Sequence, residues 1–129
     1  MSFSTDVAIR TLWMEARGEP EQGQRAVAHV IWNRLKDGRW GHTLASVCLS
    51  PEQFSCWNER DPNRMKMAVL GEQDPVILKL ADLFASAYGE VDPTDGAMWY
   101  YAPKGVILPP YWAAEKTFTG VFGSQRFYR

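Results

Sequence analysis

"LWMEARGEPEQGQRAVAHVIWNRLK", residues 12–36, contains two amphipathic runs separated by a Gly-Glu-Pro break. The first run begins near residue 5, where Ser4 or Thr5 is expected to cap a helix over 5–16. Gly18 and the proline at position 20 should end this helix by residue 18. The small and apolar positions of its inward stripe share a spacing of three and four residues with one carboxylate: Ala8, Thr11, Leu12 and Glu15.

The second run predicts a helix that starts at Pro20 and continues to about Lys36. Its apolar face is formed by residues at helical spacing: Ala26, Val27, Val30, Ile31 and Leu35. His29 falls on the opposite, polar face, where a solvated histidine is expected.

The sequence after residue 36 indicates further helices and short strands. Residues 43–49 and 64–70 favour short helices, and residues 75–88 keep helical spacing throughout. The aromatic run 97–101 and the β-branched run 116–122 favour short strands. We therefore expect one mainly helical domain of class α+β, covering residues 1–129, with a small β element late in the chain.

Composition narrows the class of protein. Apolar residues make up 46% of the chain and charged residues 22%, which is typical of a globular domain with a core. The net charge is -1, without a basic stripe that could neutralise phosphates, so we expect no nucleic-acid partner. A signal peptide and a transmembrane stretch are both missing from the pattern, so we expect no membrane insertion and a cytoplasmic location.

Cysteine and histidine are too sparse for a metal centre. Two cysteines, Cys48 and Cys56, and two histidines do not have zinc-site spacing, and two cysteines do not make a disulfide framework. We expect structural or free thiols, with a bridge between the two left open. No metal and no cofactor are expected.

Glu15 is the strongest candidate for chemistry. If the helix packs by its inward stripe, the carboxyl enters a semi-enclosed site near the negative end of the helix dipole. Both effects raise the pKa of a carboxyl, as a general acid for glycosidic cleavage requires. From pattern alone an alternative stays open, in which Glu15 turns outward and pairs with Arg17 or Arg34, or binds the amides at the start of the second helix.

Glu19 and the aromatic residues are the other candidates. Pro20 displaces Glu19 from the first helix, so we expect it to cap the second helix, with the role of catalytic acid as the alternative. Seven aromatic residues fall in segments without regular structure or in short strands, which favours a carbohydrate cleft although any single one could be core. They are Trp40, Trp57, Trp99, Tyr100, Tyr101, Tyr111 and Trp112.

Nearly the whole chain resembles the SleB/CwlJ-type cell wall hydrolases, the catalytic domains of spore-cortex-lytic enzymes that also occur in bacteriophage endolysins. The resemblance is carried by residues 13–40, by "VCLSPEQFSCWN" (47–58), "DPTDGAMWYYAP" (92–103) and "FGSQRFYR" (122–129). It departs from the family at Trp99 and Gln125, where the family often has histidines.

The resemblance implies a lysozyme-like fold related to goose-type lysozyme and lytic transglycosylases. It also implies cleavage of peptidoglycan between N-acetylmuramic acid and N-acetylglucosamine, with Glu15 as the catalytic residue. Substrate contacts are expected from residues around it: Glu19, Gln53, Phe54, Ser55, Trp57, Tyr100 and Tyr101.

One acid without an obvious carboxylate partner favours a lytic transglycosylase, and a hydrolytic muramidase or glucosaminidase is the alternative. The competing class is a non-catalytic peptidoglycan-binding or virion structural module. An amidase or peptidase would need a zinc set or an activated nucleophile that the sequence does not offer. We expect a monomeric phage endolysin, held in the host cytoplasm until a separate protein permeabilises the membrane.

Overall fold

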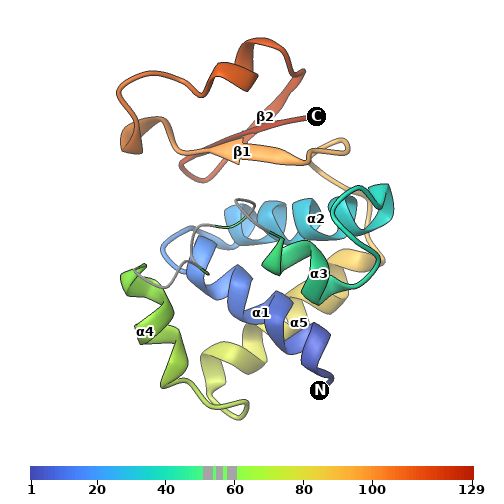
Figure 1. The fold of residues 1–129 in the computed structure, drawn as a ribbon, viewed down its shortest axis with the longest axis vertical. Helices are drawn as coiled ribbons and strands as arrows, with labels where there is room; N and C mark the ends of the chain where they lie inside the picture. The colour runs from blue at the N-terminus through green and yellow to red at the C-terminus, as the bar shows by residue number, and fades with distance from the viewer. Residues whose placement is uncertain (51–53, 55–56, 58–60) are drawn as a thin grey trace.

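The computed structural model describes residues 1–50, Phe54, Trp57 and 61–129. In this part of the chain, helices precede a small sheet (Figure 1). The α-helices are α1 (Phe3–Ala16), α2 (Glu21–Asp37), α3 (Leu44–Leu49), α4 (Pro62–Ala68) and α5 (Pro75–Tyr88). The strands are β1 (Trp99–Tyr101), β2 (Phe118–Phe122) and β3 (Gln125–Tyr128), and two 3-10 turns lie between β1 and β2, at Pro103–Gly105 and Tyr111–Ala114.

Helix α1 begins earlier than the pattern predicted. The Ser2 side chain accepts a hydrogen bond from the Thr5 backbone N–H, so Ser2, and not Ser4 or Thr5, is the N-cap. The inward stripe is confirmed, because Ala8, Thr11 and Leu12 are fully buried. The helix ends at Ala16, which leaves Glu15 in its last turn.

Helix α2 ends at Asp37, and its C-cap is Gly38, whose φ of 88° lies in the left-handed region that glycine adopts without strain. Its apolar face packs against α1, α3 and α5 and supplies the centre of the core. Helix α5 has the bounds that the sequence predicted, and Asp74 caps it by accepting from the Val76 N–H.

The sheet has the strand order β1-β3-β2, with antiparallel pairing throughout. Strands β1 and β2 were predicted, but the central strand β3 was not. In β1 the register pairs Tyr100 with Phe127 of β3, so these two side chains lie on one face of the sheet. Phe127 is fully buried, which identifies this face as the one that covers the core.

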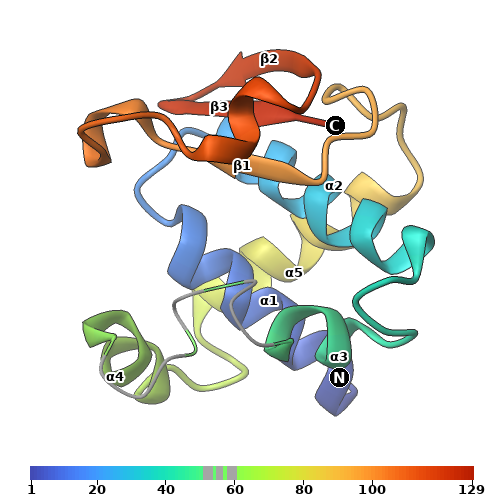
Figure 2. The same cartoon turned by 45° about the horizontal axis from the view of Figure 1, so that its top comes forward.

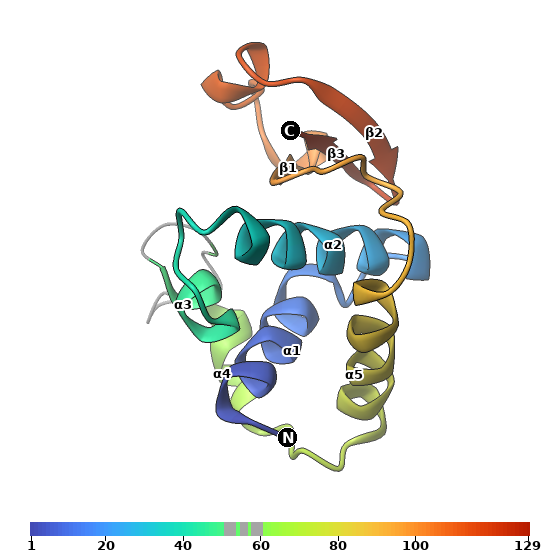
Figure 3. The ribbon, with the colours of Figure 1, turned by 90° about the vertical axis from the view of Figure 1, so that its right-hand side faces the viewer.

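The helices and the sheet form two layers, and α2 lies between the sheet and helices α1 and α5 (Figure 3). After a rotation of the first view, the sheet again covers α2 while α3 and α4 lie on the side away from it (Figure 2). This arrangement brings the C-terminal turn of α1 and the first strand of the sheet to the same part of the molecule.

Candidate active site

Glu15 contacts the first strand of the sheet through its carboxyl group. Glu15 is half-buried, and the Tyr100 hydroxyl donates a hydrogen bond to its Oε1 at 2.5 Å. The contact joins α1 to β1 across 85 residues of sequence. The inward orientation of Glu15 that the stripe predicted is therefore confirmed.

The Tyr100 ring packs against the neighbouring strand of the sheet. Its ring stacks on Phe127, with centroids 5.3 Å apart and planes inclined by 24°. Its neighbours in β1 alternate to the other face, where Tyr101 stacks on Tyr128 and meets Trp112 edge to face. Of the two tyrosines predicted to contact substrate, Tyr100 thus lies at Glu15 and Tyr101 does not.

Arg34 is a buried cation close to this pair. Its side chain is 4% exposed, and its Nε donates to the Met98 carbonyl oxygen at 2.9 Å. Burial lowers the pKa of Arg34, and the neighbouring Tyr100, Cys48 and Glu15 act in the opposite direction. Arg34 stands three and seven residues after Ile31 and Val27 on the buried face of α2, a spacing that could have identified it in the sequence.

Trp57 is tied to the same helix that carries Glu15. Its indole N–H donates to Thr11 Oγ1 at 2.8 Å, and the Thr11 hydroxyl donates to the Val7 carbonyl at 2.7 Å. Thr11 lies one turn before Glu15, so this bond fixes Trp57 near the site.

Cys48 is not a nucleophile in this setting. It is a free thiol on α3, fully buried, and burial raises its pKa to about 12. The thiolate that nucleophilic or metal chemistry requires is therefore not populated near neutral pH. Cys56 lies outside the described residues.

Two residues of the predicted substrate-binding segment, Gln53 and Ser55, lie outside the described residues. Phe54 is 3% exposed, and its ring packs 4.8 Å from the Arg34 guanidinium. Phe54 therefore packs in the core, and the prediction that it contacts the glycan stays a prediction.

Glu19 does not cap α2, because the N-cap position belongs to Pro20 and carries no side-chain hydrogen bond. Instead, its two carboxylate oxygens accept from the Ser124 N–H at 2.8 Å and the Ser124 hydroxyl at 2.7 Å. The carboxylate also occupies the space where Gly123, at φ 62°, would place a side chain. Glu19 therefore fixes the turn between β2 and β3, and the cap predicted for it is wrong.

The aromatic residues divide into separate groups. Trp40 and Trp99 meet edge to face at 5.9 Å, and the Lys116 ammonium lies 3.9 Å from the Trp99 ring centroid. Tyr111 is largely exposed. Trp99 thus holds, with cationic neighbours, one of the positions where the family often has a histidine.

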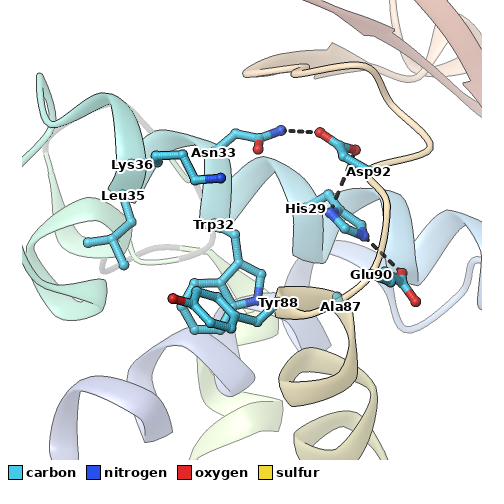
Figure 4. A pocket seen from close by; sticks show the side chains of 9 residues that line it. All are labelled: His29, Trp32, Asn33, Leu35, Lys36, Ala87, Tyr88, Glu90 and Asp92. Carbon is cyan, nitrogen blue, oxygen red and sulfur yellow. Dashed lines mark hydrogen bonds and ion pairs between the residues drawn. The ribbon is translucent and has the colours of Figure 1, made fainter.

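A second polar cluster on α2, formed by His29, Glu90 and Asp92, was not predicted from the sequence. His29 was predicted to be solvated, but it is only 3% exposed. Its Nε2 lies 2.8 Å from Glu90 Oε1 and its Nδ1 lies 3.6 Å from Asp92 Oδ1. These residues line a cavity of about 220 Å³ between α2 and the end of α5 (Figure 4). His29, Asn33 and Lys36 share a helix face turned away from Arg34, so the cavity is separate from Glu15.

Two properties of the described residues bear on cofactors and membranes. No group of three or more His, Cys, Asp or Glu side chains among them could hold a metal ion. Within the same residues, every helix is too short or too polar to cross a bilayer.

Comparisons with known proteins agree with this architecture. Residues 18–128 match the model of the family described as Cell Wall Hydrolase, a range that begins just after Glu15. The spore cortex-lytic enzyme of Bacillus subtilis is 30% identical over 108 residues, which cover 80% of this chain and 30% of that enzyme. A Bacillus cereus spore cortex-lytic enzyme is 31% identical over 103 residues, covering 76% and 34%. The chain therefore spans about a third of the length of these relatives.

Two solved structures share the fold. The catalytic domain of the germination-specific lytic transglycosylase SleB from Bacillus anthracis superimposes with a TM-score of 0.75 at 22% identity, covering all of this chain and 97% of that one. The catalytic domain of the Bacillus cereus SleB protein gives 0.76 at 23%, covering 98% and 89%. The predicted lysozyme-like, helix-rich fold with a small sheet is thereby confirmed. On the match over residues 18–128, the chain belongs to the cell wall hydrolase family.

Proposed function

We propose that this chain is a peptidoglycan lytic transglycosylase in which Glu15 is the catalytic acid and base. The observation that carries the proposal is the position of the Glu15 carboxyl, half-buried at the end of α1 and hydrogen-bonded by Tyr100. The family match supports a cell-wall substrate, and the likeness to the lytic transglycosylase domain from Bacillus anthracis supports the reaction type. The substrate is the glycan strand, cleaved between N-acetylmuramic acid and N-acetylglucosamine.

The reaction needs one carboxyl group used twice. Protonated Glu15 gives its proton to the glycosidic oxygen, and the C1–O bond breaks with positive charge developing on the muramoyl ring. The muramoyl acetamido group and surrounding dipoles stabilise that charge. The Glu15 carboxylate then takes the proton of the C6 hydroxyl, whose oxygen attacks C1 and closes a 1,6-anhydro ring, so no water is consumed.

A single-carboxyl mechanism is supported by what happens to the nearest carboxylate in the sequence. Glu19 has both oxygens engaged by Ser124, so it is committed to a turn. Two-carboxylate hydrolases place their second group about 5–10 Å from the first to act as nucleophile or to activate water. Glu19 is not poised for either task.

The test is digestion of purified peptidoglycan followed by mass spectrometry of the released fragments. We expect anhydromuramoyl ends. Reducing ends alone would make the protein a hydrolytic muramidase or glucosaminidase. Sedimentation with cell walls without any release of fragments would make it a binding or structural module.

We further propose that the protein acts as a bacteriophage endolysin, as a monomer, on walls reached from the host cytoplasm. Support comes from the resemblance, since the same catalytic domain occurs in such endolysins. Expression in a host with and without a membrane-permeabilising protein tests this role, and lysis only in the presence of that protein is expected. Light scattering after size-exclusion chromatography tests the oligomeric state.

A further inference from the structure

Arg34 is a buried charge that the proposed reaction has not yet used. We propose that Arg34 is a positioning residue for the reaction at Glu15, because its fixed guanidinium stabilises the carboxylate that forms when Glu15 gives up its proton. This inference rests on the proposed function of Glu15. Arg34 does not touch the glycan in this account, and it acts only through Glu15.

The guanidinium cannot move freely. Its Nε donates to the Met98 carbonyl oxygen at 2.9 Å, at the entry to β1. The rings of Trp40 and Phe54 lie 5.1 Å and 4.8 Å from its central carbon, within the range of cation–π attraction. Arg34 therefore ties α2 to the segment that begins the sheet and holds its charge in one place.

One donor of this buried group, Arg34 Nη1, is sealed from solvent and has no hydrogen-bond partner among the described residues. An unsatisfied buried donor on a cation costs free energy, so such an exception in a native fold calls for an explanation. A role at the neighbouring site is one such explanation.

The ionisable groups around Glu15 come from several elements. Arg34 extends from α2, Cys48 from α3 and Tyr100 from β1, and all three belong to one electrostatic neighbourhood with Glu15. On α1 itself, the Arg17 guanidinium lies 4.4 Å from the Trp13 ring centroid. On the α5 side, Lys79 lines a hollow together with Trp13 and Arg17.

Within this neighbourhood the thiol and the phenol stay neutral. Burial raises the pKa of Cys48 to about 12, and the Tyr100 hydroxyl is a hydrogen-bond donor. Arg34 keeps its charge across the physiological pH range because an arginine is protonated far above it. The group whose charge changes during the reaction is Glu15, and attraction to Arg34 favours its charged form.

The test is the pH dependence of cleavage by wild type, R34M and R34K on purified peptidoglycan. Because proton donation needs protonated Glu15, cleavage is lost on the alkaline side. Removing the cation in R34M should move the alkaline limb of the pH–rate profile to higher pH by roughly one unit. R34K, which keeps a cation, should have the same alkaline limb as wild type. A folded R34M whose limb coincides with that of wild type would overturn the proposal.

A second measurement does not depend on catalysis or on R34M folding. The titration of the Glu15 carboxyl can be followed by NMR without substrate, in wild type and in R34Q, which keeps a polar side chain at this position. We expect the Glu15 carboxyl to lose its proton at higher pH in R34Q than in wild type, because the cation that favours its charged form has been removed. Equal titration midpoints in the two folded proteins would overturn the role of Arg34. Failure of wild type to cleave peptidoglycan would instead overturn the proposed function.

Discussion

Helix α2 carries two buried basic side chains on different faces, and their surroundings differ in one respect. His29 has a carboxylate beside each ring nitrogen, with Glu90 2.8 Å from Nε2 and Asp92 3.6 Å from Nδ1. Arg34 has one donor bonded to Met98 and another, Nη1, without an acceptor in the described residues. Both groups are equally sealed from solvent, so burial alone does not distinguish them.

The difference separates a structural cluster from a functional one. Asp92 also accepts from Asn33 and from the backbone N–H groups of Thr94 and Gly96, so the His29 cluster fastens the loop between α5 and β1. A satisfied polar network of this kind rigidifies a fold. The Arg34 neighbourhood instead contains the half-buried Glu15 and a donor that has no acceptor in the part of the chain that the structure describes. Changes at the first cluster should therefore affect stability, and changes at the second should affect catalysis.

The largest effect is expected for E15Q. Loss of the proton that Glu15 supplies should slow release of fragments from purified cell walls by at least about 100-fold, because general acid catalysis contributes on this scale. The circular dichroism spectrum should remain that of the folded protein. Cleavage at the wild-type rate would break the assignment of catalysis to the Arg34 side of α2.

Tyr100 should have the next largest effect. Y100F removes the hydrogen bond to Glu15 Oε1 but keeps the ring that stacks on Phe127, so cleavage should slow roughly tenfold at little cost to stability. Y101F is the matched control, because Tyr101 lies on the opposite face of the sheet. Equal rates for the two variants would mean that the contact with Glu15 does not matter.

In the His29 cluster, Asp92 should affect the stability of the protein and the pH dependence of that stability. Burial opposes ionisation of Asp92, but hydrogen bonds from Thr94, Asn33 and the Gly96 N–H outweigh it, and the pKa of the carboxyl is lowered. A lowered pKa means that the stabilisation is complete above the ordinary aspartate value of about 3.9 and is lost as pH falls below it.

D92N should therefore be less stable than wild type by about 1–2 kcal/mol at pH 7, with the gap narrowing below about pH 4. Denaturant unfolding at several pH values measures this gap. Cleavage per folded molecule should be unchanged. A gap that widens toward acid pH, or a loss of activity without a loss of stability, would contradict the structural role of this cluster.

The smallest effect is expected for Glu19, although it is only four residues from Glu15. E19Q weakens one of two hydrogen bonds to Ser124 and should cost about 1 kcal/mol of stability or less, with cleavage within a few-fold of wild type. S124A should behave in the same way, as expected if the two residues act only on each other. Abolished cleavage in E19Q alone would reverse the roles of the two glutamates.

Elements with strong local periodicity could be predicted, and elements that depend on distant partners could not. Helices α1, α2 and α5 follow apolar residues at helical spacing, and α5 was predicted to the residue. Strand β3 is four residues long and includes Gln125 and Arg126, so its sequence has no apolar/polar alternation that would predict a strand. Pairing with β1 and β2 on its two sides stabilises it.

The site shows the same division. The inward direction of Glu15 follows from its stripe, which is local information. The cap predicted for Glu19 failed because its partner, Ser124, lies 105 residues away. His29 was predicted to be solvated, and this prediction was wrong. Glu90 and Asp92, which come from another part of the chain, cover the polar face of α2 at His29. The prediction that the pKa of Glu15 is raised stays a prediction.

The central claim is that Glu15 performs both proton transfers and that water takes no part in the cleavage. Digestion of purified peptidoglycan in ¹⁸O-labelled water, followed by mass spectrometry, tests it most directly. We predict anhydromuramoyl products without ¹⁸O from wild type, and none from E15Q. Muramoyl ends that carry ¹⁸O would show that water attacked the sugar, and would contradict the account.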